Sequence, residues 1–135
     1  MVRVLPDARS LDKAFDYLVP DELSGRVRVG TIVRVALHGR KVRGWVVADH
    51  VTPPDGVRLL SLTGVAGEGP PADVVELAGW AAGRWAGRRS SFLRTASPPV
   101  LVRSLPPAPT PTQPELGAKS RALACNLHAG TAREL

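Results

Sequence analysis

The sequence predicts an α+β fold: a small, mostly antiparallel, barrel-like β domain with one or two C-terminal helices and a disordered, proline-rich tail. Apolar and polar residues alternate through the first 65 residues, as is typical of half-buried strands. From Asp73 the apolar residues recur at helical spacing. Seven prolines lie between Pro98 and Pro114, which favours extended chain without a core. We therefore expect a folded domain over residues 1–104 and a linker and low-order tail over residues 105–135.

Five segments have the alternation of strands: residues 2–5, 15–19, 31–37, 41–51 and 57–65. In the third segment, Val33 and Val35 are expected on the buried face and Arg34 on the other. The letters HGRK between the third and fourth segments predict a hairpin with a tight turn, in which Gly39 takes a positive φ. Gly44, inside the fourth segment, predicts a bulge or a close approach of two backbones.

The helical segment begins at Asp73, which we expect to be the N-cap, with Glu76 completing a capping box. Gly87 is a natural C-terminal stop, and the letters RRSSFLRTASPP add a short second helical turn before the prolines. The tryptophans of the helix, Trp80 and Trp85, are expected in the core. The predicted apolar stripe consists of Val74, Leu77, Ala78, Ala81 and Trp85.

The positive charge of the chain predicts an anionic partner. Lysine and arginine outnumber aspartate and glutamate by 18 to 12, which gives a net charge of +6. The stretch from Arg26 to Arg43 has six cationic side chains and no acid, and a second acid-free stretch runs from Leu77 to Pro114. Arginine favours phosphate because its planar guanidinium donates two hydrogen bonds at once. The alternative is that these charges are scattered over solvated faces.

The motif content of the sequence favours a binding protein over an enzyme, and we expect no catalytic residue, no metal site and no cofactor. The sequence contains no phosphate-binding loop, dinucleotide fingerprint, zinc-protease motif or nucleophile elbow. A single cysteine excludes an internal disulfide and fits a reducing compartment. No apolar run is long enough to span a membrane, so we expect a cytoplasmic, nucleoid-associated protein. The three histidines and the cysteine lack ligand spacing or an activating neighbour: His38, His50, His128 and Cys125.

A basic, mostly β module with a few aromatic residues is typical of proteins that bind single-stranded nucleic acid, where cations hold phosphates and bases stack on rings. Phe15 and Tyr17 share one face of the second predicted strand, whereas Asp16 lies on the other face. Either Asp16 or the aromatic pair can be fully buried, but not both. The alternative is that all the aromatic residues belong to the core.

Four segments carry a resemblance to a known family. The order "VRVLP", "LDKAFDYLVP", "VGTIVRV" and "HGRKVRGWVV" resembles the N-terminal domain of primosomal protein N′, the PriA replication-restart helicase family. The later stretch "ELAGWAAGRWAGRRSSFLRTASPP" is similar to the helical segment of that family, in its actinobacterial form. The resemblance covers about residues 2–104. It implies a domain that recognises the 3′ end of single-stranded DNA or of the nascent leading strand at a stalled replication fork.

The resemblance also implies site residues. Phe15 and Asp16 match the pair that lines the family's pocket for the terminal nucleotide, Tyr17 completes the motif, and Gly39 is the equivalent of the family's turn glycine. A basic residue that contacts DNA in some members falls near Leu60 or Ser61, where Arg58 is close enough to substitute. The remaining cations near the turn are expected to hold the phosphates behind the end: Arg34, Arg40, Lys41 and Arg43.

The chemistry of a strand terminus gives Asp16 a specific role in this hypothesis. A 3′-hydroxyl is a hydrogen-bond donor that exists only at a chain end, and a carboxylate accepts such a bond while repelling phosphate. The bond contributes about 1.5–3 kcal/mol, and stacking on Phe15 or Tyr17 adds roughly 1–3 kcal/mol. The structural alternative is that Asp16 caps a turn near Pro20 or forms a salt bridge with Lys13 or Arg43.

Two functional classes remain open. The first is a monomeric module for 3′-ended DNA that cooperates with other primosome or single-strand-binding proteins. The second is a non-catalytic basic interaction module or vestigial fragment that binds nucleic acid or an acidic partner without end specificity. Because family members continue into helicase regions, we expect either a truncated or frame-shifted member or a stand-alone module, without helicase activity and without a membrane partner.

Overall fold

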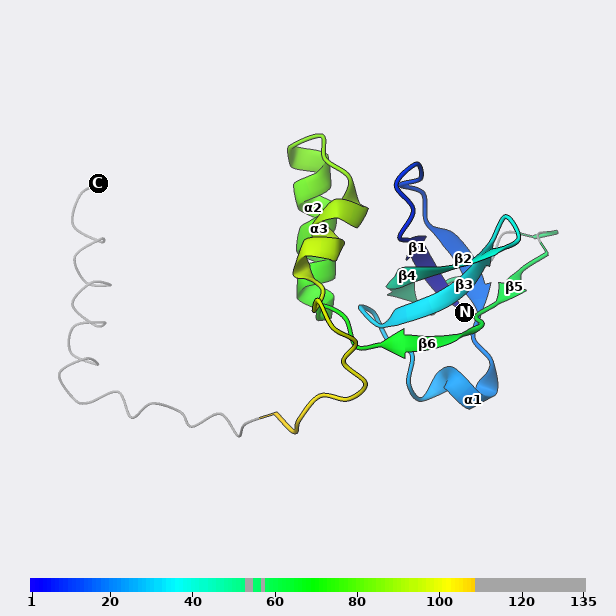
Figure 1. The fold of residues 1–135 in the computed structure, drawn as a ribbon. Coiled ribbons are helices and arrows are strands. Elements are labelled where there is room, and N and C mark those ends of the chain that lie inside the picture. Colours follow the sequence, from blue (N-terminus) through cyan, green and yellow to red (C-terminus); the bar gives the residue numbers. More distant parts are fainter. Residues whose placement is uncertain (53–54, 57, 109–135) are drawn as a thin grey trace, which may run out of the picture. The chain divides into compact units, whose positions relative to one another are not determined.

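The computed structural model describes residues 1–52, 55–56 and 58–108. A compact unit reaches from Met1 to Leu105, and it combines a six-stranded sheet with helices (Figure 1). The strands are β1 (Val2–Pro6), β2 (Phe15–Leu18), β3 (Ile32–Leu37), β4 (Arg40–Asp49), β5 (Leu60–Ser61) and β6 (Gly64–Gly67). The helices are α1 (Asp21–Ser24), α2 (Ala72–Arg84) and α3 (Arg89–Ala96). The predicted α+β class is confirmed.

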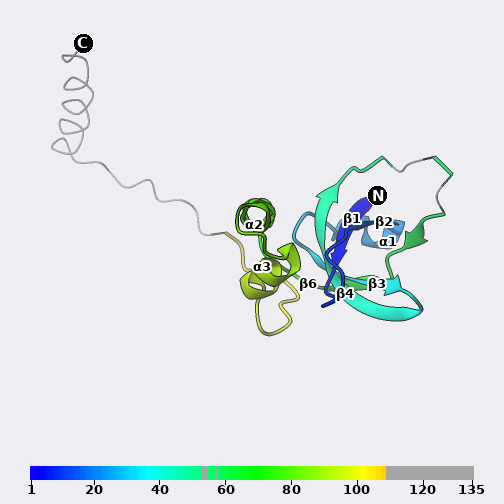
Figure 2. The same ribbon diagram turned by 90° about the horizontal axis from the view of Figure 1, so that it is seen from above.

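The sheet curls, and its two edge strands come from one segment of the chain (Figure 2). Its strand order is β5-β2-β1-β4-β3-β6, and all pairs are antiparallel except β2 with β5. Between β5 and β6, the amide of Leu62 donates to the carbonyl of Leu18 on β2, at 2.9 Å. The next amide, of Thr63, donates to the carbonyl of Arg34 on β3, also at 2.9 Å. The segment therefore connects the two edges of the sheet.

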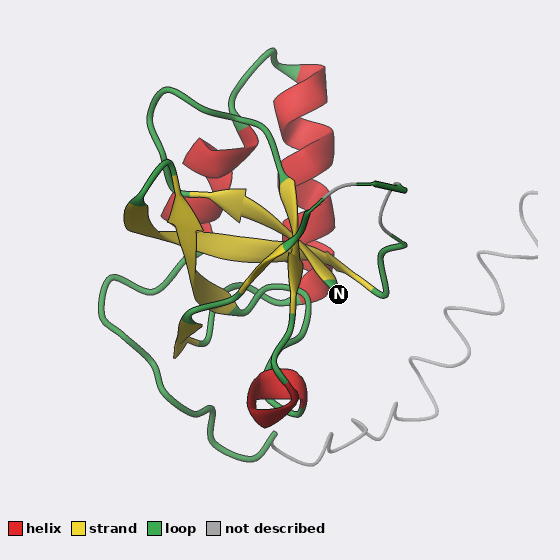
Figure 3. Ribbon diagram, turned by 90° about the vertical axis from the view of Figure 1, so that its right-hand side faces the viewer, coloured by secondary structure: helices red, strands yellow, loops and turns green. Residues whose placement is uncertain are grey.

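Strand alternation divides the apolar residues between two cores. The inner core fills the curl of the sheet and consists of Val2, Val4, Tyr17, Val33, Val35, Val46 and Leu62. The outer core lies between the sheet and the helices α2 and α3, which cover one part of the sheet (Figure 3). It consists of Leu5, Trp45, Val75, Ala78 and Leu93. The strands β1 and β4 contribute buried residues to both cores, because successive side chains of a strand point to opposite faces.

The β3–β4 hairpin agrees with its prediction. Leu37 pairs with Arg40 across a two-residue loop, in which His38 has φ 47° and Gly39 has φ 76°. Two positive φ values in a two-residue loop are those of the turn that matches strand twist best. Gly44 makes the predicted close approach, since an added Cβ would lie 2.7 Å from Cγ1 of Val4 and 2.8 Å from the carbonyl oxygen of Leu5.

The prediction of one strand over residues 57–65 is wrong, because this part of the chain serves both edges of the sheet. Leu60 and Ser61 pair with β2, whereas Gly64 and Val65 pair with β3. A straight strand cannot reach two edges, so the segment bends at Leu62 and Thr63. Val57 itself lies outside the described residues.

The N-terminus and the buried face of α2 both differ from the prediction. The helix begins at Ala72 after Pro71, and no side chain caps it, so Asp73 is not the N-cap and the capping box is wrong. Pro71 is the N-cap, and its carbonyl accepts a hydrogen bond from the amide of Val75, at 3.1 Å. The helix ends at Arg84, before the predicted stop at Gly87.

The buried residues of α2 are Val75, Ala78 and Ala81. Leu77, Trp80 and Trp85, which were predicted for the core, are 58%, 58% and 63% exposed. The two tryptophan rings meet edge to face, with centroids 5.4 Å apart. The helix therefore packs against the outer core through Val75 and Ala78, and the large rings lie outside.

The predicted second helical turn is confirmed as α3, and polar contacts hold it to the sheet and its loops. The carboxylate of Asp12 accepts hydrogen bonds from the amides of Arg89 and Ser90, both at 3.2 Å, and thereby caps the helix from a distant loop. At the other end, Trp45 Nε1 donates to Ser97 Oγ at 2.7 Å. Ser97 Oγ in turn donates to the carbonyl of Leu93 at 2.6 Å.

None of the helices in the described ranges is both long and apolar enough to cross a membrane. Within those ranges no cluster of His, Cys, Asp or Glu side chains is suited to a metal ion. Two of the residues considered for such roles, Cys125 and His128, lie outside the described ranges, as does most of the predicted linker and tail.

Substitution of Gly44 tests the close approach between β1 and β4. We expect Gly44→Ala to lower the free energy of unfolding by about 1–3 kcal/mol, because the methyl group overlaps Val4 and the Leu5 carbonyl. Gly64→Ala is the matched control, since no atom lies within 4 Å of the position of its added Cβ. Urea denaturation of both variants measures the difference, and equal stabilities would contradict this account of Gly44.

Candidate nucleic-acid interface

A cavity of about 420 Å³ lies where the start of β2, the β3–β4 turn and the segment before β5 meet. Its lining residues are Lys13, Ala14, Phe15, Asp16, Tyr17, Ala36, Leu37, His38, Arg58, Leu59 and Leu60. Three residues of the predicted end pocket, Phe15, Asp16 and Tyr17, and one predicted phosphate contact, Arg58, are therefore brought together here from segments about 40 positions apart. Gly39 does not line the cavity, but His38 does. The two residues form the same turn, and both have a positive φ.

The two aromatic residues of the cavity have different surroundings. Tyr17 is only 3% exposed, and its hydroxyl donates to the carbonyl of Ala36 on β3, at 3.2 Å. Burial raises the pKa of the Tyr17 phenol, so this hydroxyl stays protonated as a donor. Phe15 is half-buried, and Nζ of Lys13 lies 5.7 Å from the centroid of its ring. Tyr17 is thus a structural residue of the inner core, and Phe15 is the more accessible ring.

Asp16 forms a bidentate ion pair with Arg3, its cross-strand partner on β1. Nε of Arg3 lies 2.7 Å from Oδ1 of Asp16, and Nη2 lies 3.1 Å from Oδ2. The hydrogen bond from Arg3 lowers the pKa of Asp16, and the same bond raises the pKa of Arg3. Lys13 and Arg43, the partners that the sequence predicted for this carboxylate, do not form the pair. Asp16 is therefore a carboxylate held in a fixed orientation.

Asp16 and Phe15 lie on opposite faces of β2, as predicted, yet both line the cavity. The parallel strand β5 pairs only with Tyr17 and Leu18. Phe15 and Asp16 therefore precede the part of this edge that pairs with β5. Both residues line the cavity at this end of β2.

The predicted phosphate contacts fall into three groups. Arg34 pairs with Arg43 across the hairpin and Ala36 pairs with Lys41, so the three cations share one face. We call Arg34, Lys41 and Arg43 the cationic row. Arg40 pairs with Leu37 and lies on the other face, whereas Arg58 lines the cavity.

Sequence reasoning missed three residues of this site. Arg3, Lys13 and His38 were not among the predicted site residues, although each lies in or beside the cavity. Alternation in the first strand places Arg3 on the polar face, but only the register of β1 against β2 sets it opposite Asp16. The sequence carried no signal for that register.

A cavity lined by an aromatic ring and cations, next to a cationic row on a curled sheet, is typical of a DNA-binding domain. Residues 3–98 match the family model of the PriA 3′DNA-binding domain (3′BD). The chain belongs to this family, and the predicted resemblance is confirmed.

Similar proteins from mycobacteria carry the same family name. The chain is 38% identical over 90 residues to a protein named "Probable replication restart protein PriA" from Mycobacterium tuberculosis, strain CDC 1551 / Oshkosh. It is 35% identical over 112 residues to a protein of that name from Mycobacterium leprae, strain TN. These matches cover 65% and 77% of this chain but only 14% and 17% of the relatives, so the chain spans a small part of their length.

The ion pair of Asp16 predicts a dependence of stability on pH. Because Arg3 lowers the pKa of folded Asp16, the stabilising contribution is complete above the ordinary value of 3.8 and is lost as the pH falls through the lower folded-state pKa. In Arg3→Ala, we expect the Asp16 carboxyl to titrate at higher pH, as followed by carbon-detected NMR. Arg9→Ala removes an exposed arginine outside the pair and is the control; an unchanged Asp16 titration in Arg3→Ala would contradict the assignment.

Proposed function

We propose that this chain recognises the 3′-hydroxyl end of single-stranded DNA, or of the nascent leading strand at a stalled replication fork. The observation that carries the proposal is the convergence of Phe15, Asp16 and Arg58 on one cavity beside the β3–β4 turn. Such a cavity offers a ring, an acceptor and a cation to one terminal nucleotide. Residues 1–104 are the proposed DNA-binding domain, and residues 105–135 are the proposed linker and tail.

Asp16 supplies the acceptor for the terminal hydroxyl. Each carboxylate oxygen has two lone-pair directions, so the bidentate pair with Arg3 leaves acceptor capacity on both oxygens. Arg3 holds the carboxylate in place and offsets part of its charge. A 3′-phosphate is therefore rejected for two reasons: it lacks the hydroxyl that donates to Asp16, and its charge is repelled by the carboxylate.

Phe15 supplies the stacking surface in this proposal, and the cations supply the salt-dependent part of the affinity. A base that stacks on Phe15 contributes roughly 1–3 kcal/mol without reading sequence. Tyr17 supports the site from the core and does not stack, since it is only 3% exposed. The phosphates behind the end meet Arg58 at the cavity, Gly39 and Arg40 at the turn, and the cationic row along the hairpin.

The biological setting of the proposal is replication restart, which is the activity named for the mycobacterial relatives. We propose that the chain acts as a non-catalytic, monomeric module in the cytoplasm, where it associates with the nucleoid. Other primosome or single-strand-binding proteins are its proposed protein partners. The helicase activity of a longer family member is not proposed for these residues.

End recognition is tested with two short oligonucleotides that differ only in a 3′-hydroxyl or a 3′-phosphate. Fluorescence anisotropy should show about tenfold or greater preference for the hydroxyl end, which corresponds to one hydrogen bond to a charged group. Asp16→Ala should remove this preference and leave salt-dependent binding in place. Asp21→Ala, which removes an exposed acid outside the cavity, is the control and should keep the preference.

Equal affinity of the unsubstituted chain for the two ends would refute end recognition and favour the alternative, a basic module without end specificity. The pair of Asp16 with Arg3 is the observation that favours this alternative, because it gives the carboxylate a structural role. An end preference that survives in Asp16→Ala would assign recognition to another group of the cavity.

A further inference from the structure

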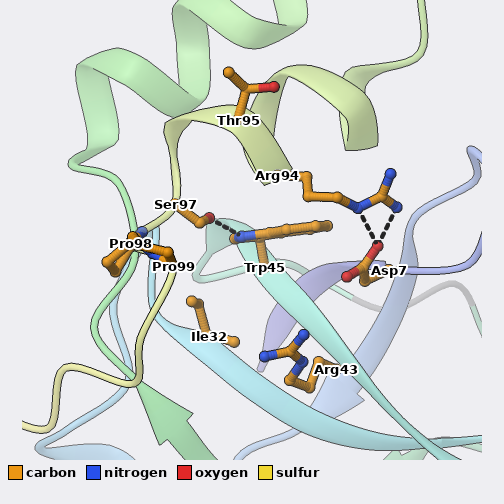
Figure 4. Close-up of a pocket in the computed structure, with 9 residues that line it drawn as sticks. All are labelled: Asp7, Ile32, Arg43, Trp45, Arg94, Thr95, Ser97, Pro98 and Pro99. Atoms are coloured by element: carbon orange, nitrogen blue, oxygen red, sulfur yellow. Dashed lines mark hydrogen bonds and ion pairs between the residues drawn. The ribbon is translucent and has the colours of Figure 1, made fainter.

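A second cavity, of about 390 Å³, lies between β4 and the C-terminal end of α3 (Figure 4). We call it the groove. In Figure 4, the Trp45 ring lies between Arg94 of α3, above it, and Arg43 of β4, below it, with Pro98 and Pro99 to the left. Its volume falls in the range of small-molecule sites, and its lining combines apolar surface with cationic side chains.

The two arginines of the groove differ in whether their charge is already paired with an acid. Arg94 donates to the carboxylate of Asp7 through Nε, at 3.1 Å, and through Nη2, so its charge is offset. The hydroxyl of Ser97 is already used by Trp45 and by the Leu93 carbonyl. Arg43 is exposed, and within the described residues its side chain has neither an ion pair nor a hydrogen bond. The groove therefore has an available cation at the side of β4.

Arg43 is also the end of the cationic row. It lies directly opposite Arg34 in an antiparallel pair, and Lys41 is the diagonal neighbour of Arg34. Like charges directly opposite each other destabilise a sheet, and no described acid forms an ion pair with any of the three. A bound anion that contacts the cations of the row would offset this repulsion, whereas water only screens it.

The row connects the groove with the first cavity. Leu37 lines the cavity at the turn, and Arg34 lies three residues earlier on β3. Three residues of an antiparallel strand span about 10 Å, which is close to the rise of about three stacked nucleotides at roughly 3.4 Å each. A strand whose last nucleotide occupies the cavity would thus bring a phosphate to Arg43 about three nucleotides behind the end.

We propose that the groove is a second DNA subsite, which takes one nucleotide about three positions behind the 3′ end and holds its phosphate at Arg43. The strand reaches it along Arg34 and Lys41. The phosphate lies on the side of β4, because the last carbonyls of α3 give the other side a partial negative charge. Sugar and base pack on Ile32 and the prolines. This inference rests on the proposed end recognition and adds a minimum strand length to it.

The test is a length series of 5′-labelled oligothymidylates with a 3′-hydroxyl, from two to eight nucleotides, bound to the full chain. Affinity should rise with oligonucleotide length up to about four or five nucleotides, the length at which the strand reaches Arg43. In Arg43→Ala, dimers should bind as before, whereas octamers should lose about two- to fivefold in affinity, as for an exposed ion pair. The salt slope for octamers should fall by about 0.7.

Arg40→Ala is the matched control, because it removes the same charge from the same hairpin but from the opposite face. Its effect should be equal for short and long oligonucleotides. Asp7→Asn should tighten binding of octamers more than of dimers, because it removes the negative charge of an acid that lines the groove together with Arg43. Thermal melting checks that each variant is folded.

The proposal fails if Arg43→Ala lowers the affinity for dimers and octamers equally. It also fails if Asp7→Asn leaves the dependence of affinity on oligonucleotide length unchanged. Failure of the proposed end recognition gives a different result: the 3′-hydroxyl and 3′-phosphate forms of a dimer bind equally, whatever happens at Arg43. The two measurements therefore separate the groove from the terminal cavity.

Discussion

The arrangement of the site depends on the segment from β5 to β6, which pairs with both edges of the sheet. Its amides at Leu62 and Thr63 bond to β2 and to β3, and Leu62 fills the inner core. This double pairing forces the sheet to curl until the β3–β4 turn lies beside the start of β2. Without the curl, the strands β1 and β4 would separate Asp16 on β2 from His38 after β3, and the cavity would not exist.

The second constraint is the attachment of α3 to the sheet. Asp12 caps the helix from the β1–β2 loop, Asp7 pairs with Arg94, and Trp45 bonds to Ser97. The outer core packs between these contacts. The helices therefore cover the outer face near Trp45 and leave its other end, with the cationic row, open to solvent. The border between the two parts is the groove.

Several predictions from the sequence hold because they depend on neighbours along the chain. The alternation of Val33, Arg34 and Val35 depends only on the period of a strand, and the HGRK turn depends on local φ preferences. The predictions for α2 fail because periodicity alone does not distinguish a face of alanines from a face of tryptophans. The outer core has room for Val75 and Ala78 against Trp45, so the larger Trp80 and Trp85 lie outside.

By itself the sequence determined the class of the fold, the hairpin and the gathering of Phe15, Asp16 and Tyr17 on one strand, because each of these follows from residue type and spacing. Only the tertiary structure decided that Arg3 holds Asp16, that Tyr17 is a core residue, and that Arg34 shares one face with Lys41 and Arg43. These facts depend on strand register and on the curl of the sheet. Register is a property of two strands together, and no single segment of the sequence encodes it.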